Sequence, residues 1–230
     1  MHLIAVRATR LIRLASALCG LAAFFLMIGA LENSAAGYAA DGARQLVYDV
    51  KHSVFGDIGT YTNQIQTSGN DTTVTTTAHL RVSALGVSMH SEDAERTEKW
   101  QGDRLVSFQG VTKKNGDTTE ISGAANGNSF VIKSPAGTVN APATVHPANP
   151  TSLKSLQSTA MMRVDSGKVE QVKLSSGKDT TVTVNGAKVP AREYEITGST
   201  HYKIWIDKQD VPIMFIVDDD SGEVTFTLKK

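Results

Sequence analysis

The residues best suited to chemistry in this 230-residue chain lie at alternate positions of the segment 86–100. A β-strand places every second side chain on the same face, so this segment gathers two acids, an imidazole, a guanidinium and an indole in one row. The row consists of His90, Glu92, Ala94, Arg96, Glu98 and Trp100. Such a row can line a ligand-binding groove, and an imidazole beside a carboxylate can exchange protons with a substrate. Its alternating charges also suit cross-strand ion pairs on a solvated sheet face, so the row predicts a ligand site only if it faces inward.

Trp205 is a second candidate for ligand contact. On a strand it shares one face with Lys203 and Asp207, whereas Ile204 and Ile206 point to the other. We expect Trp205 to pack beneath a neighbouring strand, and stacking on a ligand remains the alternative.

Other catalytic and metal-binding motifs do not stand out from the sequence. The five histidines beyond residue 40 lack the local spacing of zinc ligands. The acidic stretch 218–223 lies too close to the end of the chain for an EF-hand loop and is typical of a polar hairpin turn. No Gly-x-Ser-x-Gly nucleophile elbow is present. We therefore expect neither a metal nor a cofactor, and the sequence favours a non-catalytic protein while leaving an enzyme open.

The elements that must position these residues are strands. Residues 41–230 contain 23 Thr and 20 Val, a composition typical of β-sheet. Apolar and polar residues alternate along several segments, which are separated by Gly and Asn turn residues. We predict strands at 45–53, 59–68, 72–84, 86–100, 104–114, 117–125, 128–134, 168–175, 180–185, 188–198, 200–207, 211–218 and 223–230. Short turns favour an antiparallel meander, and so many twisted strands should curl into an open or closed barrel.

The segment 135–150 interrupts this pattern with four of the six prolines. We interpret it as a crossover loop. The spacing of Leu153, Leu156, Ala160 and Met161 predicts one short helix over 151–163. No domain boundary is evident, so residues 41–230 are expected to form a single antiparallel β domain.

The first forty residues have the layout of a secretory signal peptide. Three arginines between positions 7 and 13 precede the uncharged segment 14–31, and small residues follow. We expect cleavage between Ala36 and Asp41. An uncleaved membrane anchor is the alternative, because about 18 apolar residues can just span a bilayer.

Cleavage would change the bulk properties of the chain. It would remove the only cysteine, Cys19, so no disulfide could form in the mature protein. It would leave 20 basic and 22 acidic residues, a balance that gives no attraction to nucleic acid. We expect contact with a membrane only if the signal segment stays uncleaved.

Several motifs, in order, resemble an exported bacterial family of unknown function, the domain-of-unknown-function family sixty-one thirty-four. The similarity covers roughly residues 45–229. It is carried by Tyr48-Asp49-Val50, Gly56, Ile58-Gly59, Glu95-Arg96-Thr97-Glu98-Lys99-Trp100, Gly102, Leu105-Val106, Asn115-Gly116, His146-Pro147, Asn149-Pro150, Trp205-Ile206-Asp207, Pro212 and Gly222-Glu223-Val224-Thr225-Phe226. The chain departs from the family at Val145-His146-Pro147, where an aromatic residue is expected. The resemblance implies the fold and export, and it brings no activity, cofactor or catalytic residue.

These observations favour a periplasmic or secreted bacterial protein that binds a small amphipathic or apolar ligand within a curved sheet. The expected ligand contacts are His90, Glu92, Arg96, Glu98, Trp100 and Trp205. Two other hypotheses stay open: a structural or assembly module of the cell envelope, and a cavity enzyme using His90 with Glu92 or Glu98 as acid and base.

Overall fold

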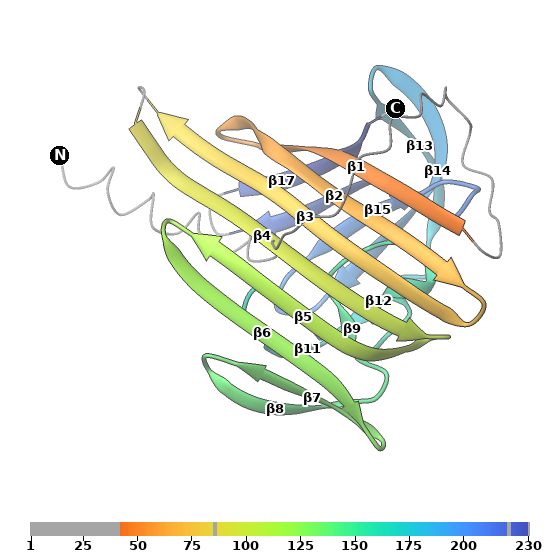
Figure 1. The fold of residues 1–230 in the computed structure, drawn as a ribbon. Helices are drawn as coiled ribbons and strands as arrows, with labels where there is room; N and C mark the ends of the chain where they lie inside the picture. The colour runs from red at the N-terminus through yellow and green to blue at the C-terminus, as the bar shows by residue number, and fades with distance from the viewer. Residues whose placement is uncertain (1–41, 85–86, 220–221, 230) are drawn as a thin grey trace.

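The computed structural model describes residues 42–84, 87–219 and 222–229, and most of these lie in β-strands (Figure 1). The predicted signal segment 1–40 lies outside the described residues. No helix found within the described residues is both long enough and apolar enough to cross a membrane.

Fourteen strands form one large antiparallel sheet (Figure 1). Its strands are β1 (Gly42–His52), β2 (Gly56–Ser68), β3 (Asp71–Ala84), β4 (Val87–Gln101), β5 (Arg104–Lys114), β6 (Asp117–Asn126), β7 (Ser129–Ser134), β8 (Gly137–Pro142), β12 (Lys173–Leu174), β13 (Lys178–Val184), β14 (Ala187–Thr197), β15 (Tyr202–Ile206), β16 (Pro212–Asp219) and β17 (Gly222–Leu228). Consecutive strands pair from β1 to β8 and from β14 to β17, and β17 pairs with β1. The predicted antiparallel meander is therefore confirmed.

The sheet is curved but is not closed by hydrogen bonds. Its pairing order runs from β12, through β14 and β17 to β1, and on to β8. Along β1, Leu46, Tyr48 and Val50 are buried while the residues between them are not fully buried, so one face of the sheet encloses a core. The result is an open, barrel-like sheet.

The tight hairpins follow the predicted turn chemistry. Asn115 and Gly116 join β5 to β6, and both have positive φ angles, 51° and 96°. Asn185 and Gly186 do the same between β13 and β14, with φ of 50° and 79°. Two consecutive positive φ angles match the right-handed twist of the flanking strands, which is why these pairs turn the chain.

The helix predicted over 151–163 is wrong. Only Lys154–Leu156 forms a 3-10 turn, and Ala160–Met162 forms β10, a strand of a second, three-stranded sheet. That sheet also contains β9 (His146–Pro147) and β11 (Val169–Gln171). Serine hydroxyl groups compete with the backbone hydrogen bonds of a helix. Ser155 Oγ accepts hydrogen bonds from the amides of residues 151 and 152, and Ser158 Oγ accepts one from Ala160 N.

Two further boundaries also differ from the predictions. The segment 135–150, expected to be a loop, contains the edge strand β8, in which only Ala141 is buried. Both faces of this strand are largely exposed, so it shows no alternation of apolar and polar residues. The predicted strand 168–175 is divided, because β11 pairs with β10 whereas β12 pairs with β14.

Two apolar cores fill the concave side of the large sheet. The larger lies between β1–β3 and β14–β17 and includes the edge-to-face and stacked rings of Tyr48, Tyr61, Phe215 and Phe226. The smaller lies between β5–β8 and the three-stranded sheet and includes Phe108, Phe130 and Met162. Strand β4 lies between these two parts of the sheet.

Candidate functional site

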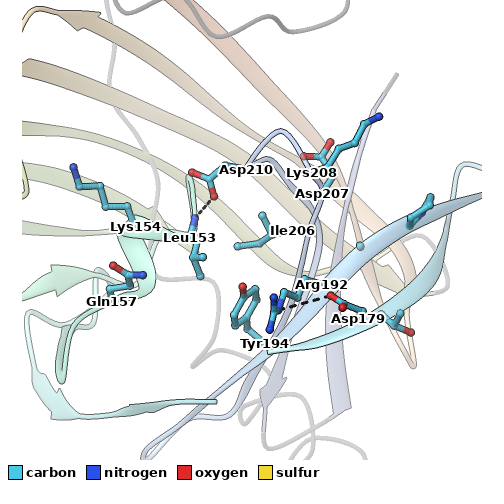
Figure 2. Close-up of a pocket in the computed structure, with 13 residues that line it drawn as sticks. Leu153, Lys154, Gln157, Asp179, Arg192, Tyr194, Ile206, Asp207, Lys208 and Asp210 are labelled. Carbon is cyan, nitrogen blue, oxygen red and sulfur yellow. Dashed lines mark hydrogen bonds and ion pairs between the residues drawn. The ribbon is translucent and has the colours of Figure 1, made fainter. Parts of the chain in front are cut away.

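A cavity of 730 Å³ opens at the β12–β14 end of the large sheet (Figure 2). Its wall is formed by the 3-10 segment, the β13–β14 hairpin and the end of β15. The lining residues are Leu153, Lys154, Gln157, Asp179, Thr180, Pro190, Ala191, Arg192, Tyr194, Ile206, Asp207, Lys208 and Asp210. The volume falls in the range of about 300–1,000 Å³ that is usual for small-molecule sites.

The middle of this wall is apolar. Leu153, Tyr194 and Ile206 gather there in Figure 2, and Tyr194 and Ile206 are buried in the larger core. Ala191 and Pro190 continue the apolar surface along β14. This part of the cavity can take an apolar body but offers it few polar contacts.

The margin of the cavity is charged. Arg192 Nε lies 3.8 Å from an Asp179 carboxylate oxygen. The Asp210 carboxylate accepts a hydrogen bond from Leu153 N at 2.6 Å, and partial burial raises the Asp210 pKa. Lys154 and Lys208 extend at opposite sides of the opening in Figure 2. A ligand with one polar end would find both signs of charge there.

The charged row of β4 faces the interior. His90, Glu92, Ala94, Arg96 and Glu98 are all buried, and the residues that alternate with them are more exposed. The structure thus places this face on the concave side. None of these residues lines the 730 Å³ cavity, so their part in ligand binding stays a prediction.

Glu98 is held by a buried network of hydrogen bonds. Asn149 Nδ2 donates to Glu98 Oε1 at 2.8 Å, and Trp100 Nε1 donates to Glu98 Oε2 at 3.0 Å. Asn149 also receives hydrogen bonds from Tyr61 Oη at 2.5 Å and Asn63 Nδ2 at 3.0 Å. Burial raises the pKa of Glu98 to about 7, although these donors and the charge of Arg96 oppose the shift.

A second part of the row joins β4 to β5. His90 Nε2 lies 3.6 Å from Glu92 Oε2, and Lys114 Nζ lies 4.0 Å from the same oxygen. Burial raises the pKa of Glu92 and lowers that of Lys114. This is the imidazole–carboxylate pair that the enzyme hypothesis requires, but neither member lies in the wall of a cavity described here.

Arg96 occupies the middle of the row. Its side chain is about 1% exposed, and none of its three guanidinium nitrogens has a hydrogen-bond acceptor among the described residues. Burial lowers its pKa to about 10, while the charges of Tyr61, Glu92 and Glu98 act in the opposite direction. Arg96 therefore remains protonated at neutral pH.

The two tryptophans occupy different environments. Trp100 lines a smaller cavity of 210 Å³ and lies edge-to-face with His146, with ring centroids 4.9 Å apart. Trp205 is buried in the larger core, and its Nε1 donates to Glu193 Oε2 at 2.9 Å. The expected packing of Trp205 agrees with this position, which lies outside the cavities described here.

Sequence reasoning missed the residues that support Glu98 and those that line the large cavity. Asn63 on β2 and Thr76 on β3 both hydrogen-bond to Asn149, which donates to Glu98. Thr76 Oγ1 also donates to Asn63 Oδ1 at 2.7 Å. Their signal was a polar residue on the otherwise apolar face of a strand. Asn149 lay in the Asn149-Pro150 motif, but its contacts depend on how a loop folds across the sheet.

No group of three or more His, Cys, Asp or Glu side chains among the described residues is arranged to hold a metal ion.

Comparisons with known proteins bear on the fold alone. A family model described as "Domain of unknown function (DUF6134)" matches residues 48–229. A solved structure, a beta-barrel-like protein of the domain of unknown function DUF1849 from Brucella abortus, is similar with a TM-score of 0.62 and 12% sequence identity. The similarity covers 84% of this chain and 98% of that one. No curated protein matches the sequence.

Proposed function

This chain belongs to the DUF6134 family of unknown function, and we propose that it is an exported, non-catalytic protein that binds a small amphipathic ligand. The observation that carries the proposal is the 730 Å³ cavity with an apolar middle and a charged margin. The ligand would place its apolar body against Leu153, Tyr194 and Ile206. Its polar end would lie near Arg192 or Lys208.

The position of the cavity supports this assignment. It opens at the end of the sheet, where β14 and β15 meet a loop rather than a further layer of strands. Burying apolar ligand surface there is worth roughly 25 cal/mol per Å² before the costs of association. Export is supported by the signal-like pattern of residues 1–40.

Thr180→Trp tests the site. Thr180 lines the cavity directly opposite Ala191 in the β13–β14 register, so a tryptophan there would fill the space that the ligand needs. Thr181→Trp is the matched control, because Thr181 is the next residue of the same strand, is exposed, and does not line the cavity. The probe is 1-anilinonaphthalene-8-sulfonate, an apolar ring system with one anionic group, measured by isothermal titration calorimetry.

We expect Thr180→Trp to weaken probe binding at least about tenfold, or about 1.4 kcal/mol, with Thr181→Trp close to the unaltered protein. Equal loss in both variants would point to binding elsewhere on the hairpin. Undiminished binding by Thr180→Trp would refute the assignment of this cavity.

A further inference from the structure

The guanidinium of Arg96 is buried in the interior of the barrel-like sheet and has no hydrogen-bond acceptor among the described residues. A guanidinium carries five N–H donors and is charged at neutral pH, and burying it without acceptors is unfavourable. Its nitrogens Nε, Nη1 and Nη2 are all buried, and no described residue accepts a hydrogen bond from any of them.

The two acids of the same row, Glu92 and Glu98, do not accept hydrogen bonds from Arg96. Glu98 accepts at both oxygens from Asn149 and Trp100. Glu92 Oε2 lies near His90 and Lys114 instead. Both carboxyl groups act on Arg96 through their charge, yet neither forms an ion pair with it within 4.0 Å among the described residues.

Further charges face Arg96 from the opposite side of the interior. Asp165, in the turn between β10 and β11, acts electrostatically on both Arg96 and Lys114 without an ion pair to either among the described residues. Its carboxylate is instead held by Arg163, with Nε and Nη2 donating at 3.0 Å and 2.6 Å. The charge of Asp165 is thus largely balanced by its own partner.

We propose that the guanidinium of Arg96 binds a small oxyanion of the carboxylate or phosphate type inside the sheet. Two oxygens on one ligand atom match the parallel N–H groups of the guanidinium fork. Gly110, opposite Arg96 in the β4–β5 register, adds no polar side chain to the site, and the Phe108 ring and Arg96 Cγ pack against the position that its Cβ would take. Arg96 does not line the 730 Å³ cavity, so the test of this proposal is independent of the test of the proposed function.

The charges around the site make anion binding depend on pH. Arg96 is faced by Glu92 and Glu98 on its own strand, Tyr61 on β2 and Asp165 across the interior, and Lys114 on β5 faces Glu92 and Asp165. Glu98, whose pKa is raised to about 7, is the neighbour that changes charge near neutrality. An anion raises that pKa further, so anion binding takes up a proton and weakens by up to about tenfold per pH unit above 7.

Arginine side-chain NMR tests the site directly. The Nε–Hε signals of 15N-arginine-labelled protein, dialysed against chloride, are followed at pH 6 during titration with acetate and separately with inorganic phosphate. Ionic strength is held constant with sodium chloride. Arg96→Lys identifies the Arg96 signal, and Arg81 is the internal control, because it lies on the surface paired with Asp93 at 2.6 Å.

The expected result is a saturable shift of the Arg96 signal with acetate, phosphate or both, and a weaker affinity at pH 8. The Arg81 signal should show no such saturation. If Arg96→Lys does not fold, the signal is assigned in the unaltered protein from its nuclear Overhauser contacts with the Phe108 ring, which lies beside it. The absence of a saturable shift with either anion, or an equal shift with chloride, would overturn the proposal.

Discussion

Glu98→Gln tests whether the buried carboxyl group of β4 makes stability depend on pH. The pKa of Glu98 is about 7 in the folded protein, against 4.5 for an ordinary glutamate, because the side chain is fully buried. Between these values the folded protein keeps a proton that the unfolded chain releases. Stability from this group is therefore complete below pH 4.5 and is lost as the pH rises through 7.

The size of the effect follows from the two pKa values. Their difference of about 2.5 corresponds to about 3 kcal/mol, which the unaltered protein should lose between pH 4.5 and pH 8. Glutamine cannot ionise, so the variant should lack this loss. It should, however, be less stable at pH 5, because glutamine has one side-chain oxygen, and its NH2 group cannot accept whichever hydrogen bond, from Asn149 Nδ2 or Trp100 Nε1, falls on that side.

Urea unfolding from pH 5 to pH 8.5 measures the difference between the two proteins. Other titrating groups, such as Glu92 with its raised pKa and His146 with its lowered pKa, contribute to both proteins and largely cancel. Between pH 5 and pH 8.5 we expect the difference in unfolding free energy to change by about 2.5 kcal/mol in favour of Glu98→Gln as the pH rises. Glu120→Gln, at an exposed position on β6, is the control and should show no such change.

A difference that stays constant within about 0.5 kcal/mol across this pH range would refute the reasoning. It would mean that Glu98 ionises in the folded protein as readily as in the unfolded chain.

Two further substitutions probe the network and the sheet. Asn149→Ala should lower the free energy of unfolding in urea by about 3 kcal/mol, because it leaves Tyr61, Asn63 and Glu98 without their shared hydrogen-bond partner. Asn140→Ala, at an exposed position on β8, is the control. A loss below about 1 kcal/mol for Asn149→Ala would contradict the structure. Gly59→Ala should lower the midpoint of thermal unfolding far more than Gly116→Ala. A Cβ at position 59 would overlap the His79 carbonyl oxygen, whereas a Cβ at position 116 meets open space. Equal effects of the two substitutions would contradict the close approach of β2 and β3.

Most strand and turn positions were readable from the sequence because both are local properties. Alternating side chains on β3 and β17 and the Asn–Gly pairs at 115–116 and 185–186 act within a few residues. The predicted helix at 151–163 failed for a non-local reason. Parallel pairing of Met161 with His146 and burial of three successive side chains in β10 outweigh the helical spacing.

The six candidate ligand contacts also separate what is local in the sequence from what depends on the tertiary structure. Period two was sufficient to place His90, Glu92, Arg96 and Glu98 on one face, and the sequence by itself determined that grouping. Only the tertiary structure decided that this face is buried, because the direction in which a sheet curls depends on packing across its concave side. The same packing brings the loop residue Asn149 to Glu98 and leaves the guanidinium of Arg96 without an acceptor among the described residues.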